Sequence, residues 1–254
     1  MDNIKFSVIT VCYNAADSIR QTIESVMQQT YQNMEYIIKD GNSTDTTQEI
    51  LQEYSDSVLL LQGKDRGIYD AMNIAADHAT GDYIFFLNAG DIFYSKDVLM
   101  QIGEILKQEK TVDVLYGNMI SLKEHESVLI KNSSFCRSKL FHLTGAMISH
   151  QTIFAKKECF RETPFDLRYR ICADRDWLLK QIDKKKKMRY VDIQVSVCSA
   201  DGYSLKNVKL YEKEALECIE EHFGQLVIIY KAVCKLKQNK FIQKNALKLI
   251  EKRR

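Results

Sequence analysis

An aspartate that directly follows a short apolar segment carries the clearest chemical signal in this chain of 254 residues. Residues 83–87 are apolar and include aromatic and β-branched side chains, which is typical of a strand covered on both faces. Ala89 and Gly90 then form a turn of small residues, which leaves space for a ligand beside the backbone. Asp91 comes next, with Asn88 nearby, where α/β sheets commonly bind ligands. A carboxylate there suits a hard divalent cation bound to phosphates, so we predict a metal site at Asp91.

A structural role for Asp91 is the alternative. Aspartate is a common N-cap, and a helix is expected at about residues 95–107. Ser95 is better placed to cap that helix, so metal binding is the favoured interpretation. Because Asp91 is the only carboxylate of its segment, magnesium or manganese would take further ligands from Asn88, the backbone and substrate phosphate.

Strand and helix patterns alternate through the first half of the chain. Strands are expected at residues 4–12, 34–39, 58–61 and 83–87. Helices are expected after caps at Asp17 and at Ser43 or Thr44, and again at residues 68–78. This alternation predicts an α/β fold with a mainly parallel, twisted sheet flanked by helices.

The second half has a less regular pattern. Strands are expected at residues 114–118, 128–131, 151–155 and 188–191, and a helix at 173–182. Two helices, at 206–223 and 225–254, are joined at Gly224. With 45% hydrophobic residues the chain can bury one sizeable core. We therefore expect a catalytic domain at residues 1–205 and a basic helical extension at 206–254.

Several motifs occur in the order and spacing of a known enzyme family. They are Ser-Val-Ile-Thr-Val-Cys-Tyr-Asn at residues 7–14, Asp-Gly-Asn-Ser-Thr-Asp at 40–45, Asp-Arg-Gly-Ile-Tyr-Asp-Ala-Met-Asn at 65–73 and Asn-Ala-Gly-Asp at 88–91. Together with an acidic motif near Asp174, they resemble the inverting glycosyltransferases of family 2, which have the GT-A fold. The similarity extends over residues 6–204. The motif at 65–73 is typical of a subgroup that makes cell-surface polysaccharides.

The resemblance implies a reaction and its partners. The enzyme would move a hexose-type sugar from a nucleoside diphosphate, expected to be uridine diphosphate, to a hydroxyl of a glycan or lipid-linked acceptor. A divalent metal, magnesium or manganese, would stabilise the leaving diphosphate, and a carboxylate would accept the proton of the acceptor hydroxyl. The family commonly has two carboxylates in the segment at 88–91, where this chain has only Asp91.

The same resemblance assigns residues to the donor. Asp40, at the end of the second strand, is expected to read the nucleotide base, with Thr10 and Tyr13 bracketing its ring. Asp65 follows the third strand and is expected to contact the base or the ribose. In the alternative interpretation Asp40 only starts the turn at Gly41, an ordinary role for aspartate.

Asp174 is the predicted catalytic base, because residues 172–177 resemble the acidic motif that deprotonates the acceptor in this family. On residue types alone, the segment could be only a charged helix start. Asp176 would point elsewhere on the helix and support the structure. His150 precedes Gln151 as in the subgroup and is predicted to contact donor phosphate or acceptor, although a lone histidine is also commonly structural.

Cysteines and charge constrain location and partners. The seven cysteines include no Cys-x-x-Cys pair, which favours a reducing cytosol, and neither a signal peptide nor an apolar segment of membrane-spanning length is expected. Residues 225–254 hold nine basic residues and one acidic, a net charge of +8, whereas residues 1–224 carry 27 basic and 33 acidic, or −6. We predict that this tail binds the anionic inner face of the membrane; the alternative is that it packs on the domain.

Two other functions fit parts of the pattern. A sugar-phosphate nucleotidyltransferase would have a glycine-rich, arginine-containing loop after the first strand, and residues 11–16 contain neither residue type. A non-catalytic nucleotide-binding module would not need Asp174. Nucleic acid is not an expected partner, because the tail has only Tyr230 and Phe241 as aromatic residues among its lysines.

Overall fold

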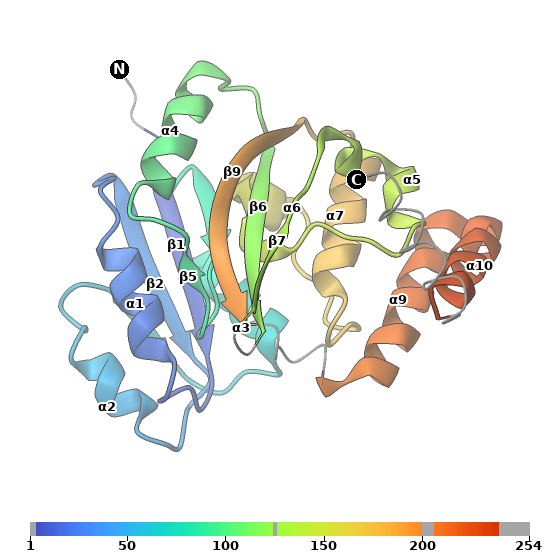
Figure 1. Ribbon diagram of the computed structural model, residues 1–254. Coiled ribbons are helices and arrows are strands. Elements are labelled where there is room, and N and C mark those ends of the chain that lie inside the picture. The colour runs from blue at the N-terminus through green and yellow to red at the C-terminus, as the bar shows by residue number, and fades with distance from the viewer. Residues whose placement is uncertain (1–3, 124–125, 200–205, 239–254) are drawn as a thin grey trace.

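The computed structural model describes residues 4–123, 126–199 and 206–238 (Figure 1). Its strands are β1 (Phe6–Cys12), β2 (Met34–Asp40), β3 (Leu59–Gln62), β4 (Tyr83–Phe86), β5 (Ile92–Phe93), β6 (Val114–Lys123), β7 (Glu126–Ile130), β8 (Ile153–Lys156) and β9 (Met188–Ser199). Its α-helices are α1 (Ile19–Met27), α2 (Thr47–Gln52), α3 (Ile68–Asp77), α4 (Val98–Gln108), α5 (Lys139–His142), α6 (Lys157–Glu162), α7 (Ala173–Asp183), α9 (Val208–Phe223) and α10 (Val227–Gln238). Short 3-10 helices lie at Ser134–Arg137, His150–Thr152 and Gly224–Leu226.

The strands form one mixed sheet in the order β3-β2-β1-β4-β8-β6-β9-β5, and β7 pairs with β6. The strands of the first half, β1 to β4, pair in parallel, as the alternating pattern predicts. The second half is mixed, because β8, β7 and β5 join antiparallel while β9 pairs parallel with β6. The predicted α/β class is confirmed, and its parallel character is confined largely to the N-terminal half of the chain.

Strand β9 is much longer than predicted. The apolar pattern indicates a strand only to Val191, because Asp192 and Gln194 interrupt it. In the structure, residues 188–199 form one strand that pairs along β6 and then with β5. Pairing with β6 on one side, joined by β5 at Ser196 and Val197, satisfies much of the backbone of this segment, so its polar side chains do not end the strand.

The sheet is covered on both faces, as Figure 1 shows for the helices around β1. Phe6 and Val8 of β1 point to one face and pack in a cluster with residues of α1 and α4. Ile9 and Val11 point to the other face and pack with residues of α3 and α7. All residues of β1 are buried, which explains the continuous apolar segment rather than an alternating one.

The helix caps differ from those predicted. The N-caps of α1, α2 and α4 are Ser18, Thr46 and Asp97, each one to three residues further along the chain than expected. Because α4 begins at Val98, Asp91 does not cap it. The structural alternative for Asp91 is therefore wrong.

The described part of the C-terminal extension packs on the catalytic domain. Ala215 and Ile219 of α9 and Tyr230 of α10 belong to the same buried cluster as Trp177 of α7. Gly224 lies between α9 and α10 with φ +53°, a left-handed conformation that glycine tolerates. A division of domains at residue 205 stays a prediction, and residues 239–254 lie outside the described part. Among the described helices, none is both long enough and apolar enough to cross a membrane.

The close approach of β6 and β9 predicts a stability effect. A Cβ atom at Gly117 of β6 would lie 2.6 Å from the Ile193 carbonyl oxygen and 2.7 Å from Val195 Cγ2 of β9. Gly117→Ala should therefore lower the free energy of unfolding by about 1–3 kcal/mol, the usual cost of overpacking. Chemical denaturation measures this, with exposed Ser127→Ala of β7 as the control. Equal stability of Gly117→Ala and wild type would show that β9 can move away at no cost.

Candidate active site

The predicted ligand-binding residues gather at one edge of the sheet. β1 pairs in parallel with both β2 and β4, so the carboxyl ends of these strands lie side by side. Tyr13 follows β1, Asp40 ends β2, and Asn88 and Asp91 follow β4. The parallel topology thus brings together residues that are far apart in the sequence.

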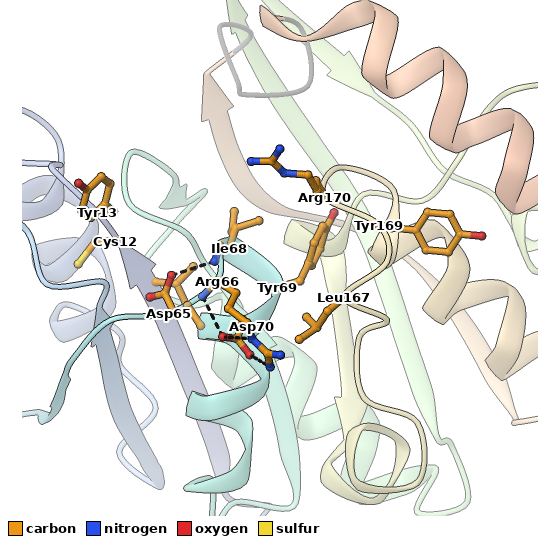
Figure 2. A pocket seen from close by; sticks show the side chains of 13 residues that line it. Cys12, Tyr13, Asp65, Arg66, Ile68, Tyr69, Asp70, Leu167, Tyr169 and Arg170 are labelled. Carbon is orange, nitrogen blue, oxygen red and sulfur yellow. Dashed lines mark hydrogen bonds and ion pairs between the residues drawn. The ribbon is translucent and has the colours of Figure 1, made fainter.

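A cavity of about 500 Å³ opens at this edge (Figure 2). Its walls come from the end of β1, the start of α3 and the loop before α7. The lining side chains that Figure 2 labels include Tyr13, Asp65, Arg66, Ile68, Tyr169 and Arg170. The Tyr13 ring is 62% exposed, so it is free to contact a ligand. The cavity has the size of a small-molecule site.

Asp65 is held in the cavity wall by Lys39, a residue that was not among the predicted site residues. Lys39 Nζ lies 3.0 Å from Asp65 Oδ2 and also donates to the carbonyl oxygens of Asp40 and Gly63. The Lys39 side chain is only 3% exposed. A lysine directly after the apolar residues 36–38 was the available signal, since a buried ammonium needs fixed acceptors.

Thr10 and Asp40 do not reach the cavity. The Thr10 hydroxyl donates to the Leu87 carbonyl oxygen at 2.7 Å, and its side chain is fully buried. The Asp40 carboxylate is also fully buried and accepts hydrogen bonds from the backbone N–H and the hydroxyl of Ser43. In this structure Asp40 holds the turn after β2, as in the alternative interpretation, and contact of Thr10 or Asp40 with a base stays a prediction.

Asp174 and His150 are in direct contact. Asp174 lies in the first turn of α7, and its Oδ2 is 3.0 Å from His150 Nδ1. His150 Nε2 lies 2.9 Å from Asn88 Nδ2. An amide nitrogen only donates, so Nε2 accepts and the ring proton lies on Nδ1, where it is donated to Asp174. The hydrogen bonds therefore fix both the tautomer and the orientation of His150.

Asp91 is hydrogen-bonded to Gln151, the residue that follows His150. Gln151 Nε2 donates to Asp91 Oδ2 at 3.2 Å. Asp91 is 8% exposed, and burial raises the pKa of its carboxyl above the ordinary value. In the described part of the chain no lysine or arginine forms an ion pair with Asp91, so a buried negative charge there lacks a cation.

Asn88 and Asp91 offer oxygen ligands of the kind that a hard divalent cation binds. Asn88 Oδ1 is buried without a hydrogen-bond partner in the structure. A carboxylate oxygen and an amide oxygen are the ligand types that magnesium and manganese prefer. A buried oxygen without a hydrogen-bond partner and a buried carboxylate without an ion pair, three residues apart in the sequence, fit the predicted metal site at Asp91.

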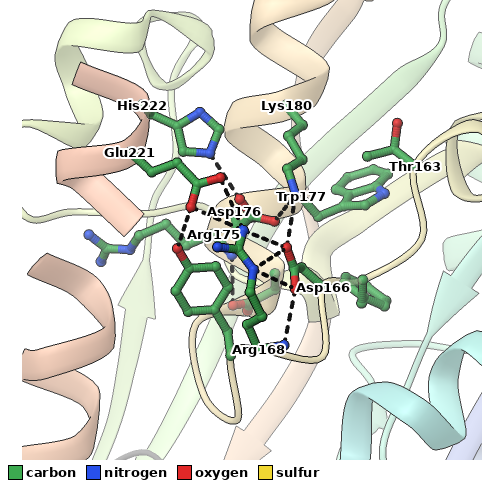
Figure 3. Close-up of polar contacts among 12 residues, drawn as sticks. Thr163, Asp166, Arg168, Arg175, Asp176, Trp177, Lys180, Glu221 and His222 are labelled. Carbon is green, nitrogen blue, oxygen red and sulfur yellow. Dashed lines mark hydrogen bonds and ion pairs between the residues drawn. The ribbon is translucent and has the colours of Figure 1, made fainter. Parts of the chain in front are cut away.

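Asp176 belongs to a separate polar cluster between α7 and α9 (Figure 3). Its carboxylate contacts Lys180 Nζ at 2.7 Å and His222 Nε2 at 2.9 Å, and its side chain is fully buried. Burial opposes the charge of His222, but hydrogen bonds to Asp176 and Asp183 raise its pKa. The expectation that Asp176 supports the structure agrees with these contacts.

Arg168 and Arg170 differ in whether their guanidinium groups are paired with protein carboxylates. Arg168 pairs with Asp166 and Glu221, so it is engaged with protein carboxylates rather than free to meet phosphate (Figure 3). Arg170 lines the cavity and remains available to an anionic ligand. Of the described residues, Asp176, Cys218 and His222 are a group whose ligand atoms could approach one metal, but Asp176 and His222 already pair with each other and with Lys180 and Asp183.

Comparison with known proteins identifies the family. The model of "Glycosyl transferase family 2" matches residues 7–165, more than half of the chain. A PGL/p-HBAD biosynthesis glycosyltransferase of Mycobacterium bovis is 29% identical over 222 residues, 84% of this chain and 82% of that protein. The UDP-Glc:alpha-D-GlcNAc-diphosphoundecaprenol beta-1,3-glucosyltransferase WfgD of Escherichia coli is 37% identical over 120 residues, 46% of this chain and 47% of that protein.

Solved structures of glycosyltransferases share the fold. S. aureus TarS in complex with UDP-GlcNAc superposes with a TM-score of 0.69 at 18% identity, over 89% of this chain and 69% of that chain. The mannosyltransferase PcManGT of Pyrobaculum calidifontis, in complex with GDP-Man and Mn2+, gives 0.59 at 17% identity, over 99% and 80%. The chain therefore belongs to glycosyl transferase family 2 and is a glycosyltransferase with the GT-A fold.

Proposed function

We propose that this enzyme transfers a sugar from a uridine diphosphate sugar to a hydroxyl of a lipid-linked acceptor, with inversion, in the assembly of a cell-surface glycan. The single observation that carries the proposal is the dipeptide His150–Gln151. His150 binds Asp174 at 3.0 Å, and Gln151 binds Asp91 at 3.2 Å. One short segment thus holds the proposed base and the proposed metal ligand at the ligand-binding edge of the sheet.

The arrangement supports a direct displacement. The acceptor oxygen would bond to the anomeric carbon as the bond to the diphosphate breaks, and Asp174 would take the hydroxyl proton. His150 donates from Nδ1 to Oδ2, which keeps the carboxylate oriented while a second lone pair remains for the proton. Asp91 and Asn88 would hold a divalent cation, which when bound supplies positive charge for the leaving diphosphate.

The donor would lie in the 500 Å³ cavity. Tyr13 offers an exposed ring on which a base can stack, and Asp65 offers a carboxylate fixed by Lys39. Uridine diphosphate is the proposed nucleotide, because the name of the relative WfgD specifies a UDP-sugar donor. That relative's name also specifies a diphosphoundecaprenol acceptor, which supports a lipid-linked acceptor here.

The exposed residues of helix α10 support association of the enzyme with the membrane surface. Val227 and Tyr230 pack into the core, whereas Ile228 and Ile229 are 70% and 47% exposed. Exposed Lys231 lies two residues after Ile229. Apolar side chains beside lysines are typical of helices that lie at an anionic membrane surface, where each basic residue contributes about 1 kcal/mol.

Asp174→Asn tests the base. The amide keeps the shape and can still accept from His150, but it cannot take a proton, so kcat should fall by roughly 10²–10⁴. Release of UDP from UDP-glucose and UDP-N-acetylglucosamine measures kcat, and calorimetry with UDP measures donor-site affinity. Affinity should stay near the wild-type value.

The exposed Asp77→Asn of α3 is the control for loss of one carboxylate. Wild-type kcat in Asp174→Asn would remove Asp174 from the reaction. If UDP affinity collapses instead, Asp174 belongs to the donor site.

Asp91→Asn tests the metal site through stability as well as activity. Because burial raises the Asp91 pKa, the ionised carboxylate costs stability at pH values above that pKa. Metal-free Asp91→Asn should therefore have a higher Tm than wild type at pH 7, and the difference should shrink as the pH falls and Asp91 takes up a proton. Manganese should raise the Tm of wild type but not of the variant.

Turnover of Asp91→Asn should fall by at least ~100-fold, since one electrostatic stabiliser of a transition state is typically worth that much. The exposed Asp56→Asn serves as the control and should keep both the manganese response and the activity. A manganese-induced rise in Tm that persists in Asp91→Asn would place the metal elsewhere.

Membrane association is tested with point variants of the full chain, because Val227 and Tyr230 are part of the core and deletion of the tail would disturb it. Wild type should sediment with phosphatidylglycerol vesicles at low salt, and less so as salt rises. Ile228→Glu and Lys231→Glu should each weaken binding several-fold. Lys213→Glu, on an exposed part of α9, is the control. Wild-type protein that stays in solution would make α10 structural only.

A further inference from the structure

We propose that Glu214 of α9 is a positioning residue for the catalytic base. This inference rests on the proposed role of Asp174. Glu214 Oε1 accepts the backbone N–H of Arg170 at 2.9 Å. Its Oε2 accepts the N–H groups of Ile171 and Cys172 at 2.8 and 3.0 Å. A single carboxylate therefore binds three consecutive backbone amides of the loop that leads into α7.

The loop bound by Glu214 sets the place of Asp174. Cys172 is the N-cap of α7, and Asp174 is the second residue of that helix. A change of backbone angle at residues 170–172 would therefore move the Asp174 carboxylate away from His150 and from the acceptor. A displacement of about 1 Å in a reacting group can cost ~10²-fold in rate.

The loop is held from the opposite side as well. Tyr69 Oη of α3 donates to the Ile171 carbonyl oxygen at 2.7 Å, and Tyr69 also lines the cavity (Figure 2). The N–H groups thus face α9 and the Ile171 carbonyl faces α3. Together the two contacts fix the peptide planes between the cavity wall and the first turn of α7.

No ion pair explains why the Glu214 carboxylate is buried. Its residue is only 4% exposed, and no lysine, arginine or histidine of the described chain lies within ion-pair distance of it. A buried carboxylate is costly unless it is hydrogen-bonded, and here backbone amides at the start of a helix satisfy it. The positive end of the α7 dipole adds to this stabilisation.

A second contact joins the same two helices. Arg175, the residue after Asp174, is fully buried, and its guanidinium donates to Tyr211 Oη of α9 at 2.9 Å. Arg175 Nε and one terminal nitrogen have no hydrogen-bond partner. Helix α9 therefore contacts both the residues before Asp174 and the residue after it, so the C-terminal extension is expected to contribute to turnover rather than only to stability.

Glu214→Gln and Glu214→Ala in the full-length enzyme test the proposal. Glutamine has one acceptor oxygen for three N–H groups, and its amide nitrogen opposes at least one of them. We expect kcat for UDP release to fall by about 30-fold or more in either variant, while calorimetry with UDP shows a change in affinity of less than about threefold. Glu217→Gln, an exposed carboxylate on the same helix, should match wild type.

Wild-type kcat in folded Glu214→Gln overturns the proposal, and so does a loss of UDP affinity as large as the loss of kcat. Should both variants fail to fold, hydrogen exchange of the wild-type enzyme decides. The amides of residues 170–172 precede the helix, yet they should exchange slowly because Glu214 binds them, and rapid exchange there contradicts the proposal.

Asp174→Asn distinguishes a failure of the proposed base from a failure of the positioning role of Glu214. If that variant keeps its kcat, the proposed base is wrong. If it loses activity while Glu214→Gln keeps wild-type kcat, only the positioning role is refuted.

Discussion

A glycosyl transfer site of the proposed kind needs a base and a metal ligand that stay at a fixed separation, and the hydrogen bonds of His150 and Gln151 provide it. Asp174 comes from α7 and Asp91 from the turn after β4, on elements that are not joined directly. Adjacent side chains of one dipeptide bind both carboxylates. Their backbone continues into β8, which is paired with β4 and β6, so the sheet itself holds the dipeptide in place.

Buried charge is distributed around this centre in two ways. Lys39, Asp176 and Glu214 are buried polar groups whose partners are in the protein, and each fixes a backbone segment or another side chain. Asp91 differs, because burial raises its pKa and the hydrogen bond from Gln151 is not joined by an ion pair in the described chain or by backbone donors like the three that Glu214 has. Such a contrast is typical of functional sites, where one group is left to be satisfied by a ligand.

The C-terminal helices connect this centre to the outer surface. α9 contacts the start of α7 through Glu214 and Tyr211, and α10 covers part of the same core through Val227 and Tyr230. The exposed face of α10 is apolar and basic. In the proposed function, the element that positions the base is therefore adjacent to the element that meets the membrane, where a lipid-linked acceptor would be.

The sequence by itself determined the parallel half of the sheet and the residues at its edge. Strand and helix periodicity are local properties, and a βαβ order places the ends of consecutive parallel strands together, so the place of Asp91 after its strand could be predicted from the residues. Tyr13 and Asp65 were expected there from the resemblance to the family. Only the tertiary structure decided the rest. It extended β9 past Asp192 by pairing it along β6, turned Thr10 and Asp40 into the protein, and joined Glu214 to amides more than 40 residues earlier in the chain. These outcomes depend on contacts between distant segments, which no local pattern of residues encodes.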